Sequence, residues 1–366
     1  MAGKKTPLYD EHLKLGGKIV DYAGWLLPIQ YEGLVIEHNA VRERAGIFDV
    51  SHMGLIQVEG RDALAFLDYL MTNNINRIKR NQIIYTFMCY PDGGVVDDLL
   101  VYKHHKEKFL LVVNAANLEK DLEWIEENKN NYQVEIEDIT EEISILALQG
   151  PEAESILQGL TETDLSKIKF FHFKEDIKIC NISALVSRTG YTGEDGFEIF
   201  VQSKKVEKLW EQILDFGKDY GLKPAGLGCR DTLRFEAALP LYGKELSADI
   251  SPIEADLKFF VKVNKPSNFI GKDALKEQVD GNIKRLLVGF ELLDRGIPRE
   301  GYKLYKADKE IGYVTTGYMS PSLGKSIGNA LIDIDEAKIG NEIDIMIRNR
   351  AVKAKIIDRN FLKNNK

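Results

Sequence analysis

The sequence is poor in the residues that build disulfide frameworks and zinc centres. Its 366 residues include three cysteines and six histidines, and no CxxC or HExxH motif joins them. An odd, scattered set of cysteines is typical of reduced thiols, so we expect Cys89, Cys180 and Cys229 to pack as small hydrophobic side chains. His104 and His105 are adjacent in a predicted strand and therefore point to opposite faces. We expect no metal site in this chain.

The sequence also lacks a long apolar run, an apolar signal segment and a block of basic residues. No stretch approaches 18 consecutive apolar residues, and no apolar segment follows the basic start MAGKKTPLYDEHLK. The 49 basic and 57 acidic residues give a formal net charge of −8, without a run of five or more basic residues. We therefore expect no membrane and no nucleic-acid partner, and a cytoplasmic location, or an organellar one if a targeting segment has been removed.

Nucleotide-binding motifs are absent as well. Gly324, Lys325 and Ser326 resemble the end of a P-loop, but Met319 occupies the position at which GxxxxGK[ST] requires glycine. The segment AGLGCRD, residues 225–231, contains GxG without the third glycine and without a preceding strand of the right kind. Neither a P-loop nor a Rossmann fold is therefore expected.

The chain does contain alternating strand and helix patterns over residues 18–280, followed by a different pattern. Helical periodicity predicts helices over 32–45, 61–71, 117–129, 151–159, 204–220 and 228–238, and apolar segments predict strands near 53–59, 83–89, 95–102, 108–113, 143–148, 182–187 and 197–201. Because hairpins recur, the mixture favours an α+β fold over a doubly wound sheet. Beyond residue 283, short strands separated by turn signals predict a separate all-β barrel or sandwich.

Two adjacent carboxylates inside an apolar strand are the most informative feature of the sequence. Residues 83–102 read IIYTFMCYPDGGVVDDLLVY, in which PDGG supplies a turn between two strands. Asp97 and Asp98 point to opposite faces of the second strand, so at least one carboxylate lies against apolar surface. An unpaired carboxylate there costs roughly several kcal/mol, and proteins retain such a group where the charge has a use. The alternative is an edge strand that uses charge to block aggregation.

The length of the turn decides which side chains share a face with each aspartate. A two-residue loop at Asp92 and Gly93 places Phe87 opposite Asp98 and Tyr85 two positions further along the strand. Because opposed residues share a face, Tyr85, Phe87 and Asp98 would then lie together. A loop one residue longer reverses the faces.

Two further segments combine a tight backbone with charge. In LVSRTGYTGEDGFEIFV, residues 185–201, three glycines interrupt two strands and Glu198 follows inside an apolar run. A buried carboxylate in a strand repeats the pattern of Asp98; the alternative is a glycine-rich hairpin with one outward glutamate. In GLGCRDTLRFEAALPLYG, residues 226–243, the predicted helix carries Arg230, which either neutralises Glu198 or an acidic ligand or forms a surface ion pair.

These segments resemble the aminomethyltransferase, or T-protein, family of the glycine cleavage system. The matching segments are YAGWLLPIQY (22–31), VRERAGIFDVSHMG (41–54), YPDGGVVDDL (90–99), VNAAN (113–117), LALQGP (146–151), SRTGYTGEDGFE (187–198), AGLGCRDTLRFEA (225–237) and TTGYMSPSLGKSIGNA (315–330). They occur in order and span nearly the whole chain, and the ordered set is far more specific than any single motif.

The resemblance implies an α+β fold of three domains around a central folate-binding channel. The first, discontinuous domain would comprise residues 1–50 and 142–230, the second 51–141 and 231–280, and residues 281–366 would form a C-terminal all-β barrel domain. In the implied reaction, lipoylated H-protein delivers a sulfur-bound aminomethyl group and tetrahydrofolate accepts the carbon as 5,10-methylene-tetrahydrofolate. Ammonia and dihydrolipoyl H-protein are released. Tetrahydrofolate is a co-substrate, and no metal, flavin or nicotinamide is needed.

Carried over residue by residue, the resemblance assigns the catalytic carboxylate to Asp98, the second aspartate of GGVVDD. This carboxylate would hold the pterin nitrogens and stabilise the positive charge that develops as the amine leaves, with general-base action on N5 as the alternative role. The folate-contacting positions match Met53, Tyr85, Asn114, Tyr191, Glu198, Arg230 and Tyr242. The extreme C-terminal tail, NFLKNNK, does not align with the tail contact that some family members use.

Two other functions stay open from the sequence. A different tetrahydrofolate-dependent enzyme on the same scaffold, such as a demethylase acting on a sulfonium or methoxy substrate, would keep much of the set of segments. A non-catalytic folate-binding protein would lack much of it, whereas this chain retains Asp98, Glu198 and Arg230. Release of ammonia from aminomethylated H-protein separates these functions from the one that the resemblance implies.

Overall fold

The structure is a computed structural model that describes residues 3–362. Most of the C-terminal tail NFLKNNK therefore lies outside the described residues. The chain divides into two compact units: unit 1 comprises Met1–Leu67, Ile75–Tyr85 and Leu99–Leu233, and unit 2 comprises Asp68–Asn74, Thr86–Asp98 and Arg234–Lys366. The division into three domains that the resemblance implies stays a prediction.

A six-stranded sheet of order β11-β12-β13-β10-β4-β14 lies in unit 1. Its strands are β4 (Ala45–Asp49), β10 (Ile143–Gln149), β11 (Phe173–Ile179), β12 (Ile182–Ser187), β13 (Gly196–Gln202) and β14 (Leu222–Pro224). Neighbouring strands pair antiparallel except β14, which runs parallel to β4. Every residue of β4 is buried, which explains why its sequence AGIFD shows no alternation of apolar and polar residues.

The two faces of this sheet carry separate hydrophobic cores. On one face, α5 (Ala153–Gln158) and α6 (Val206–Gly217) pack against the strands, with Trp210 fully buried. On the other face, α2 (Leu34–Glu43) and α7 (Leu227–Glu236) contribute to a core around Phe48 and Phe200. The apolar stripe of the predicted 204–220 helix therefore packs in the core, as expected from its 3.6-residue period.

A second, five-stranded sheet has the order β6-β7-β8-β5-β9. Its strands are β5 (Gly54–Glu59), β6 (Gln82–Cys89), β7 (Val95–His105), β8 (Lys108–Val113) and β9 (Glu135–Asp138), and the helices of this part of the chain are α3 (Ala63–Leu70) and α4 (Leu118–Glu127). The division between the two units falls inside β6 and β7. Because β7 lies between β6 and β8, it is not an edge strand. The interpretation that its two aspartates block aggregation at a sheet edge is therefore wrong.

Several short elements escape the sequence patterns. A three-stranded sheet near the N-terminus contains β1 (Lys4–Lys5), β2 (Lys18–Tyr22) and β3 (Trp25–Gln30), and α1 (Tyr9–Lys14) lies between β1 and β2 in the chain. These elements have two to six residues each, so they are too short to display a period. The predicted helix over 32–45 ends at Glu43 because the buried strand β4 begins at Ala45.

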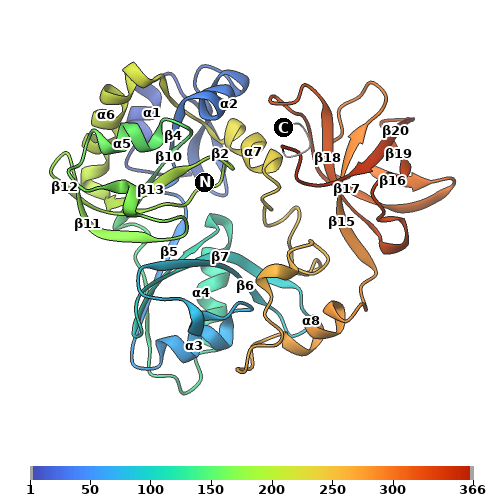
Figure 1. The fold of residues 1–366 in the computed structure, drawn as a ribbon, viewed down its shortest axis with the longest axis horizontal. Helices are drawn as coiled ribbons and strands as arrows, with labels where there is room; N and C mark the ends of the chain where they lie inside the picture. Colours follow the sequence, from blue (N-terminus) through green and yellow to red (C-terminus); the bar gives the residue numbers. More distant parts are fainter. Residues whose placement is uncertain (1–2, 363–366) are drawn as a thin grey trace. The chain divides into compact units, whose positions relative to one another are not determined.

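Unit 2 contains a closed barrel, which Figure 1 shows in orange to red. Its strand order is β15-β18-β17-β16-β19-β20, with β15 (Arg285–Leu292), β16 (Lys303–Lys306), β17 (Lys309–Met319), β18 (Ser326–Asp333), β19 (Glu342–Ile347) and β20 (Arg350–Ile357). Because β15, the first strand, also pairs with β20, the last, the sheet closes on itself and forms a barrel and not a sandwich. The helix α8 (Lys272–Val279) precedes the barrel in the chain. The α+β fold class with a C-terminal barrel is confirmed.

Candidate functional site

Three of the residues assigned to folate come together in unit 1. The guanidinium carbon Cζ of Arg230, on α7, lies 4.6 Å from the centroid of the Tyr191 ring. Glu198, on β13, is close enough to Arg230 for the positive charge to act on its carboxyl group. All three side chains are partly exposed. A strand, a glycine-rich loop and a helix therefore converge on a cluster of charged and aromatic groups.

The carboxylate of Glu198 is embedded in hydroxyl groups. Its Oε2 accepts a hydrogen bond from Thr189 Oγ1 at 2.6 Å and a longer one from Tyr102 Oη at 3.5 Å. Ser187 Oγ lies 2.7 Å from Thr189 Oγ1 and 3.1 Å from Tyr102 Oη, so the hydroxyls form one network. This environment argues against the interpretation of Glu198 as an outward surface glutamate.

Burial dominates the electrostatics of Glu198. Loss of water raises the pKa of this carboxyl above its usual range, and Thr189, Arg230 and Tyr102 offset part of the effect. A raised pKa in the folded state means that ionised Glu198 lowers the stability of the folded protein as the pH rises above the usual carboxyl range. Retaining such a group is typical of a binding site, where a ligand supplies the missing hydrogen-bond donors.

Two side chains that the sequence patterns did not single out hold the glycine-rich loop. Gln149 Nε2 donates to the carbonyl oxygen of Thr189 at 3.0 Å, and Gln149 Oε1 accepts from Thr192 Oγ1 at 2.9 Å. Arg42 Nη1 donates to the carbonyl oxygen of Thr192 at 2.7 Å and to Glu194 Oε1 at 2.8 Å. The loop that bears Tyr191 is therefore fixed from two directions.

The glycines of this loop are required by the close approach of Gln149. A Cβ atom at Gly190 would lie 1.9 Å from Gln149 Oε1, and one at Gly196 would lie 2.5 Å from Gln149 Nε2. Because the amide of Gln149 is buried and hydrogen-bonded, it has no room to withdraw. The LALQGP segment and the glycine-rich segment therefore form one local structure, although they are far apart in the sequence.

Met53 and Asn114 lie next to each other at one end of a strand pair. The antiparallel ladder between β5 and β8 ends with the pair Gly54 and Val113. Met53 precedes Gly54 and Asn114 follows Val113, so both residues leave the sheet at the same end. Both side chains are partly exposed. The structure therefore brings these two assigned folate contacts together.

The turn between β6 and β7 contains three residues, Pro91, Asp92 and Gly93, and not only the two residues Asp92 and Gly93. Tyr90 N donates to Gly94 O at 2.8 Å and Gly93 N donates to Tyr90 O at 3.0 Å, with Gly93 at a φ of 93°. This is a three-residue loop in which a turn is followed by a glycine in the left-handed region. The loop is therefore one residue longer than the two-residue loop, which is the alternative that the sequence left open.

At the other end of the hairpin, Asn81 N donates to Lys103 O at 2.7 Å. In a regular antiparallel ladder the bonded pairs recur every second residue, whereas Tyr90 and Asn81 are nine positions apart, so the pairing is irregular between them. Which aspartate shares a face with Tyr85 and Phe87, and the role of Tyr85 as a folate contact, stay predictions.

The two aspartates, Asp97 and Asp98, differ in their exposure to solvent. Asp97 is completely buried, whereas Asp98 is partly exposed. The alternation continues along β7, since Leu99 is buried and Leu100 is partly exposed. Of the two carboxylates, Asp98 is therefore the one that a ligand can reach.

Tyr242 is the remaining assigned residue, and it lies in unit 2 with Asp98. Its side chain is partly exposed, and its Oη donates to the carbonyl oxygen of Val95 at 3.2 Å. Val95 is the first residue of β7, three positions before Asp98. Tyr242 therefore anchors the beginning of the strand that presents Asp98.

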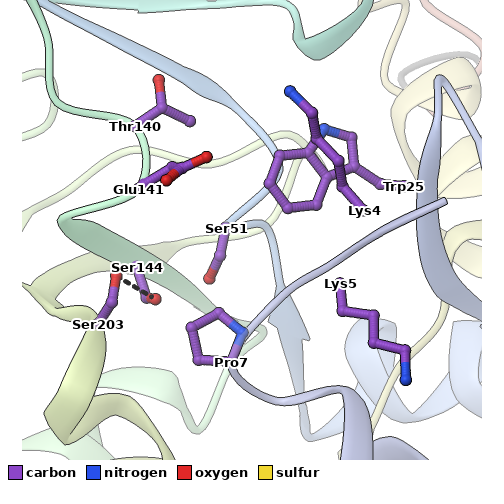
Figure 2. A pocket seen from close by; sticks show the side chains of 9 residues that line it. All are labelled: Lys4, Lys5, Pro7, Trp25, Ser51, Thr140, Glu141, Ser144 and Ser203. Atoms are coloured by element: carbon purple, nitrogen blue, oxygen red, sulfur yellow. Dashed lines mark hydrogen bonds between the residues drawn. The ribbon is translucent and has the colours of Figure 1, made fainter. Parts of the chain in front are cut away.

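A separate pocket of about 390 Å³ lies in unit 1 beside β1 and β3. Figure 2 shows the nine side chains that line it: Lys4, Lys5, Pro7, Trp25, Ser51, Thr140, Glu141, Ser144 and Ser203. Its hydroxyl groups are engaged within the protein; for example, Ser144 Oγ donates to Ser203 Oγ at 3.1 Å, and Thr140 Oγ1 accepts from Leu55 N at 2.9 Å. The pocket contains none of the assigned site residues.

Known families and relatives match nearly the whole chain. Residues 8–265 match the family described as GCVT N-terminal domain, and residues 285–363 match the glycine cleavage T-protein C-terminal barrel domain. The chain is 61% identical over 362 residues to an aminomethyltransferase of Thermoanaerobacter pseudethanolicus, covering 99% of this chain and 98% of that protein. It is 53% identical over 358 residues to an aminomethyltransferase of Clostridium botulinum, covering 98% of this chain and 97% of that protein.

The fold also matches a solved structure. Glycine cleavage system aminomethyltransferase T from Bartonella henselae aligns with a TM-score of 0.91 at 31% identity and covers 98% of both chains. Among residues 3–362, no helix combines the length and the apolar character needed to cross a membrane. With both domains matched in order and relatives identical at more than half of their aligned positions, the chain belongs to the glycine cleavage T-protein family and has its activity, tetrahydrofolate-dependent aminomethyl transfer.

Proposed function

We propose that Asp98 performs this transfer while Glu198, Arg230 and Tyr191 hold the folate. The observation that carries the proposal is the cluster in unit 1, where a desolvated carboxylate adjoins a guanidinium that lies over an aromatic ring. A carboxylate suits the neighbouring amino and imino donors of a pterin, because it accepts two parallel hydrogen bonds. Met53, Asn114, Tyr85 and Tyr242 complete the proposed folate contacts.

The reaction breaks one C–S bond and one C–N bond. The carbon of S–CH2–NH3+ on the lipoyl arm becomes bonded to N5 and N10 of tetrahydrofolate, the sulfur leaves as a thiol, and the nitrogen leaves as ammonium. The two hydrogens lost from N5 and N10 go to the sulfur and to the departing ammonia, so atoms and charge balance. No redox step occurs, and we propose that no metal, flavin or nicotinamide takes part.

Asp98 supports this reaction through its negative charge. As the C–N bond of the aminomethyl group breaks, positive charge spreads over the carbon and its remaining neighbours. A fixed carboxylate stabilises that charge more effectively in a partly desolvated site than in water. Asp98 is partly exposed on an interior strand, so it combines a fixed position with access to a ligand. Direct proton abstraction from N5 is the alternative role of the same group.

The proposed partner is lipoylated H-protein, and the proposed location is the cytoplasm. A transfer assay tests the activity: the protein is mixed with tetrahydrofolate and aminomethylated H-protein, and ammonia and 5,10-methylene-tetrahydrofolate are measured. We expect the two products in equal amounts. A demethylase would instead produce a methylated or methylene folate from a sulfonium or methoxy substrate, and a non-catalytic binder would produce neither product.

Tetrahydrofolate is expected to raise the thermal stability of the protein. A ligand that binds only the folded state increases the free energy of unfolding by about 2.7 kcal/mol at a hundredfold excess over its dissociation constant. The measurement is a melting curve at increasing concentrations of tetrahydrofolate kept reduced by thiol. ATP, NAD and zinc serve as controls and are expected to leave the melting temperature unchanged. A melting temperature that does not respond to saturating tetrahydrofolate contradicts the proposed site.

The substitution Glu198→Gln is expected to weaken tetrahydrofolate binding by about 1–3 kcal/mol, because an acceptor of two charge-assisted hydrogen bonds is lost. The same variant is expected to be as stable as the wild type or more so without ligand at neutral pH, since a desolvated charge is removed. Isothermal titration and thermal melting measure the two effects. Glu137→Gln, at an exposed position of β9, is the matched control and should change neither. Equal affinity of wild type and Glu198→Gln removes Glu198 from the site.

A further inference from the structure

Three buried hydroxyl groups beside Glu198 are left unused by the proposed chemistry. Ser187 lies directly opposite Glu198 in the antiparallel pair of β12 and β13, so the two side chains share a face of the sheet. Thr189 follows Ser187 two positions later, and Tyr102 belongs to β7. Tyr102 and Ser187 are completely buried, and Thr189 is 3% exposed. Any effect of these hydroxyls on a ligand therefore passes through Glu198.

The distances give the three hydroxyls one direction of donation. An ionised carboxylate only accepts hydrogen bonds, so Thr189 Oγ1 donates to Glu198 Oε2 at 2.6 Å. Because its hydrogen is then in use, Thr189 Oγ1 accepts from Ser187 Oγ at 2.7 Å. Ser187 Oγ in turn accepts from Tyr102 Oη at 3.1 Å, a shorter distance than the 3.5 Å from Tyr102 Oη to Glu198 Oε2. The hydroxyls thus form a chain of donors that ends on the carboxylate.

The chain occupies one oxygen of Glu198 and leaves the other for a ligand. Both hydroxyl contacts of the carboxylate go to Oε2. Within residues 3–362, Oε1 accepts no hydrogen bond from the protein and is not enclosed, so a ligand can reach it. The main chain of Thr189 is itself held, since Gln149 Nε2 donates to its carbonyl oxygen at 3.0 Å. A fixed donor on Oε2 therefore restricts the rotation of the carboxylate about its Cγ–Cδ bond.

We propose that Thr189 is a positioning residue of the folate site, whose hydroxyl is the last donor of the chain and holds the carboxylate of Glu198 with Oε1 directed toward the pterin. This inference rests on the proposed folate site, in which Glu198 accepts hydrogen bonds from the amino and imino groups of the pterin. Those groups pair best with a carboxylate that is ionised and fixed in orientation. Thr189 favours both conditions, because a hydrogen bond to the ionised form stabilises that form.

The substitution Thr189→Val tests the proposal, since it keeps the shape of the side chain and removes the hydroxyl. We expect the affinity for tetrahydrofolate at neutral pH to fall about tenfold, with an increase in KM and little change in kcat. The pH below which binding is lost should rise by about one unit, because the pKa of Glu198 rises further without its nearest donor. Arg230 on α7 and Tyr102 on β7, the other groups that act on the pKa of Glu198, are unchanged in this variant. Isothermal titration at a series of pH values measures both effects.

Two variants along the chain predict a graded response. Thr189→Ser keeps the last hydroxyl without its methyl group, so its affinity and its pH midpoint of binding should be close to those of the wild type. Ser187→Ala removes the donor before the last one. It should shift the midpoint in the same direction as Thr189→Val but less, because Ser187 acts on the carboxylate only by polarising the hydroxyl of Thr189.

Thr192→Val is the matched control for loosening of the loop. Thr192 has the same side chain on the same loop and is 2% exposed, but its hydroxyl donates to Gln149 Oε1 and not to a carboxylate. This variant should lower the melting temperature and leave the pH midpoint of binding at the wild-type value. Equal midpoints in Thr189→Val and the wild type, even with a weaker affinity in the variant, would assign Thr189 a purely structural role and overturn the inference.

A measurement without ligand separates this inference from the proposed folate site. The carboxyl ¹³C chemical shift of Glu198, followed as a function of pH, should titrate at a higher pH in Thr189→Val than in the wild type and Thr192→Val. If this difference is present and the wild type binds no tetrahydrofolate, the proposed folate site is wrong while the hydrogen-bond chain stands. If the wild type binds tetrahydrofolate and the difference is absent, the chain is wrong and the folate site stands.

Discussion

Replacing Asp98 with asparagine is expected to lower the rate of carbon transfer at least about tenfold, which is 1.4 kcal/mol or more of transition-state stabilisation. The substitution keeps the shape of the side chain and removes its negative charge. The charge matters most when the amine leaves, so the effect should appear in kcat more than in KM. Folding should be unimpaired or improved, because a carboxylate in an apolar strand is neutralised. Steady-state turnover and the melting temperature measure the two effects.

Asp97→Asn is the matched control for this prediction. Asp97 is the chain neighbour of Asp98 but is completely buried, so it cannot offer its carboxylate to a ligand without rearrangement of the strand. We expect turnover closer to that of the wild type and a lower melting temperature, because a buried carboxylate is held by structural partners. If Asp97→Asn abolishes turnover while Asp98→Asn does not, the catalytic carboxylate is Asp97 and not Asp98.

Removing the carboxylate of Glu245 is expected to lower the free energy of unfolding of the protein by about 3–5 kcal/mol. Glu245 and Arg234 are both completely buried in unit 2, and Arg234 Nη1 donates to Glu245 Oε2 at 2.8 Å. Glu245 Oε1 accepts from Thr315 and Thr316 at 2.9 and 2.5 Å. In Glu245→Ala, the guanidinium of Arg234 stays buried with its charge uncompensated. Urea denaturation followed by circular dichroism measures the loss.

Two variants show whether the loss comes from the unpaired charge. The double substitution Arg234→Met/Glu245→Leu removes both charges, so it should be less destabilised than Glu245→Ala. Glu310→Ala breaks a solvent-exposed ion pair with Lys303 and should change the free energy of unfolding by less than about 1 kcal/mol. A double variant as unstable as the single one would mean that packing volume, and not charge, is the cause.

The same ion pair predicts a pH dependence. Burial alone would raise the pKa of Glu245, but the charge of Arg234 and the hydroxyls of Thr316 and Thr315 lower it below the usual range. A lowered pKa in the folded state stabilises the protein above the carboxyl pKa of the unfolded chain, which is about 4.3. This contribution is lost as the pH falls further, through the lower pKa of the folded state. Glu245→Gln should remove that part of the acid sensitivity.

The pattern of residues was enough to predict the elements that have a clear period. The stripe of α6, the strand pair on either side of PDGG and the short strands beyond residue 283 all occur where the sequence predicts them. Alternation along β7 also established that Asp97 and Asp98 face opposite ways, since successive residues of any strand do so. The ordered motifs, through their resemblance to a family, added the reaction and the assignment of the site residues.

The tertiary structure decided what depends on contacts between distant segments. It buried Asp97 and left Asp98 partly exposed, because the burial of a strand face depends on what packs against it. It decided for a loop of three residues, ending at Gly93, over the two-residue loop. It seated the amide of Gln149 against two glycines more than forty residues away, and it placed the charge of Arg230 near Glu198. A linear sequence specifies local conformation through periods and turn residues, whereas burial, charge and the closing of a barrel arise only when segments far apart in the chain meet in space.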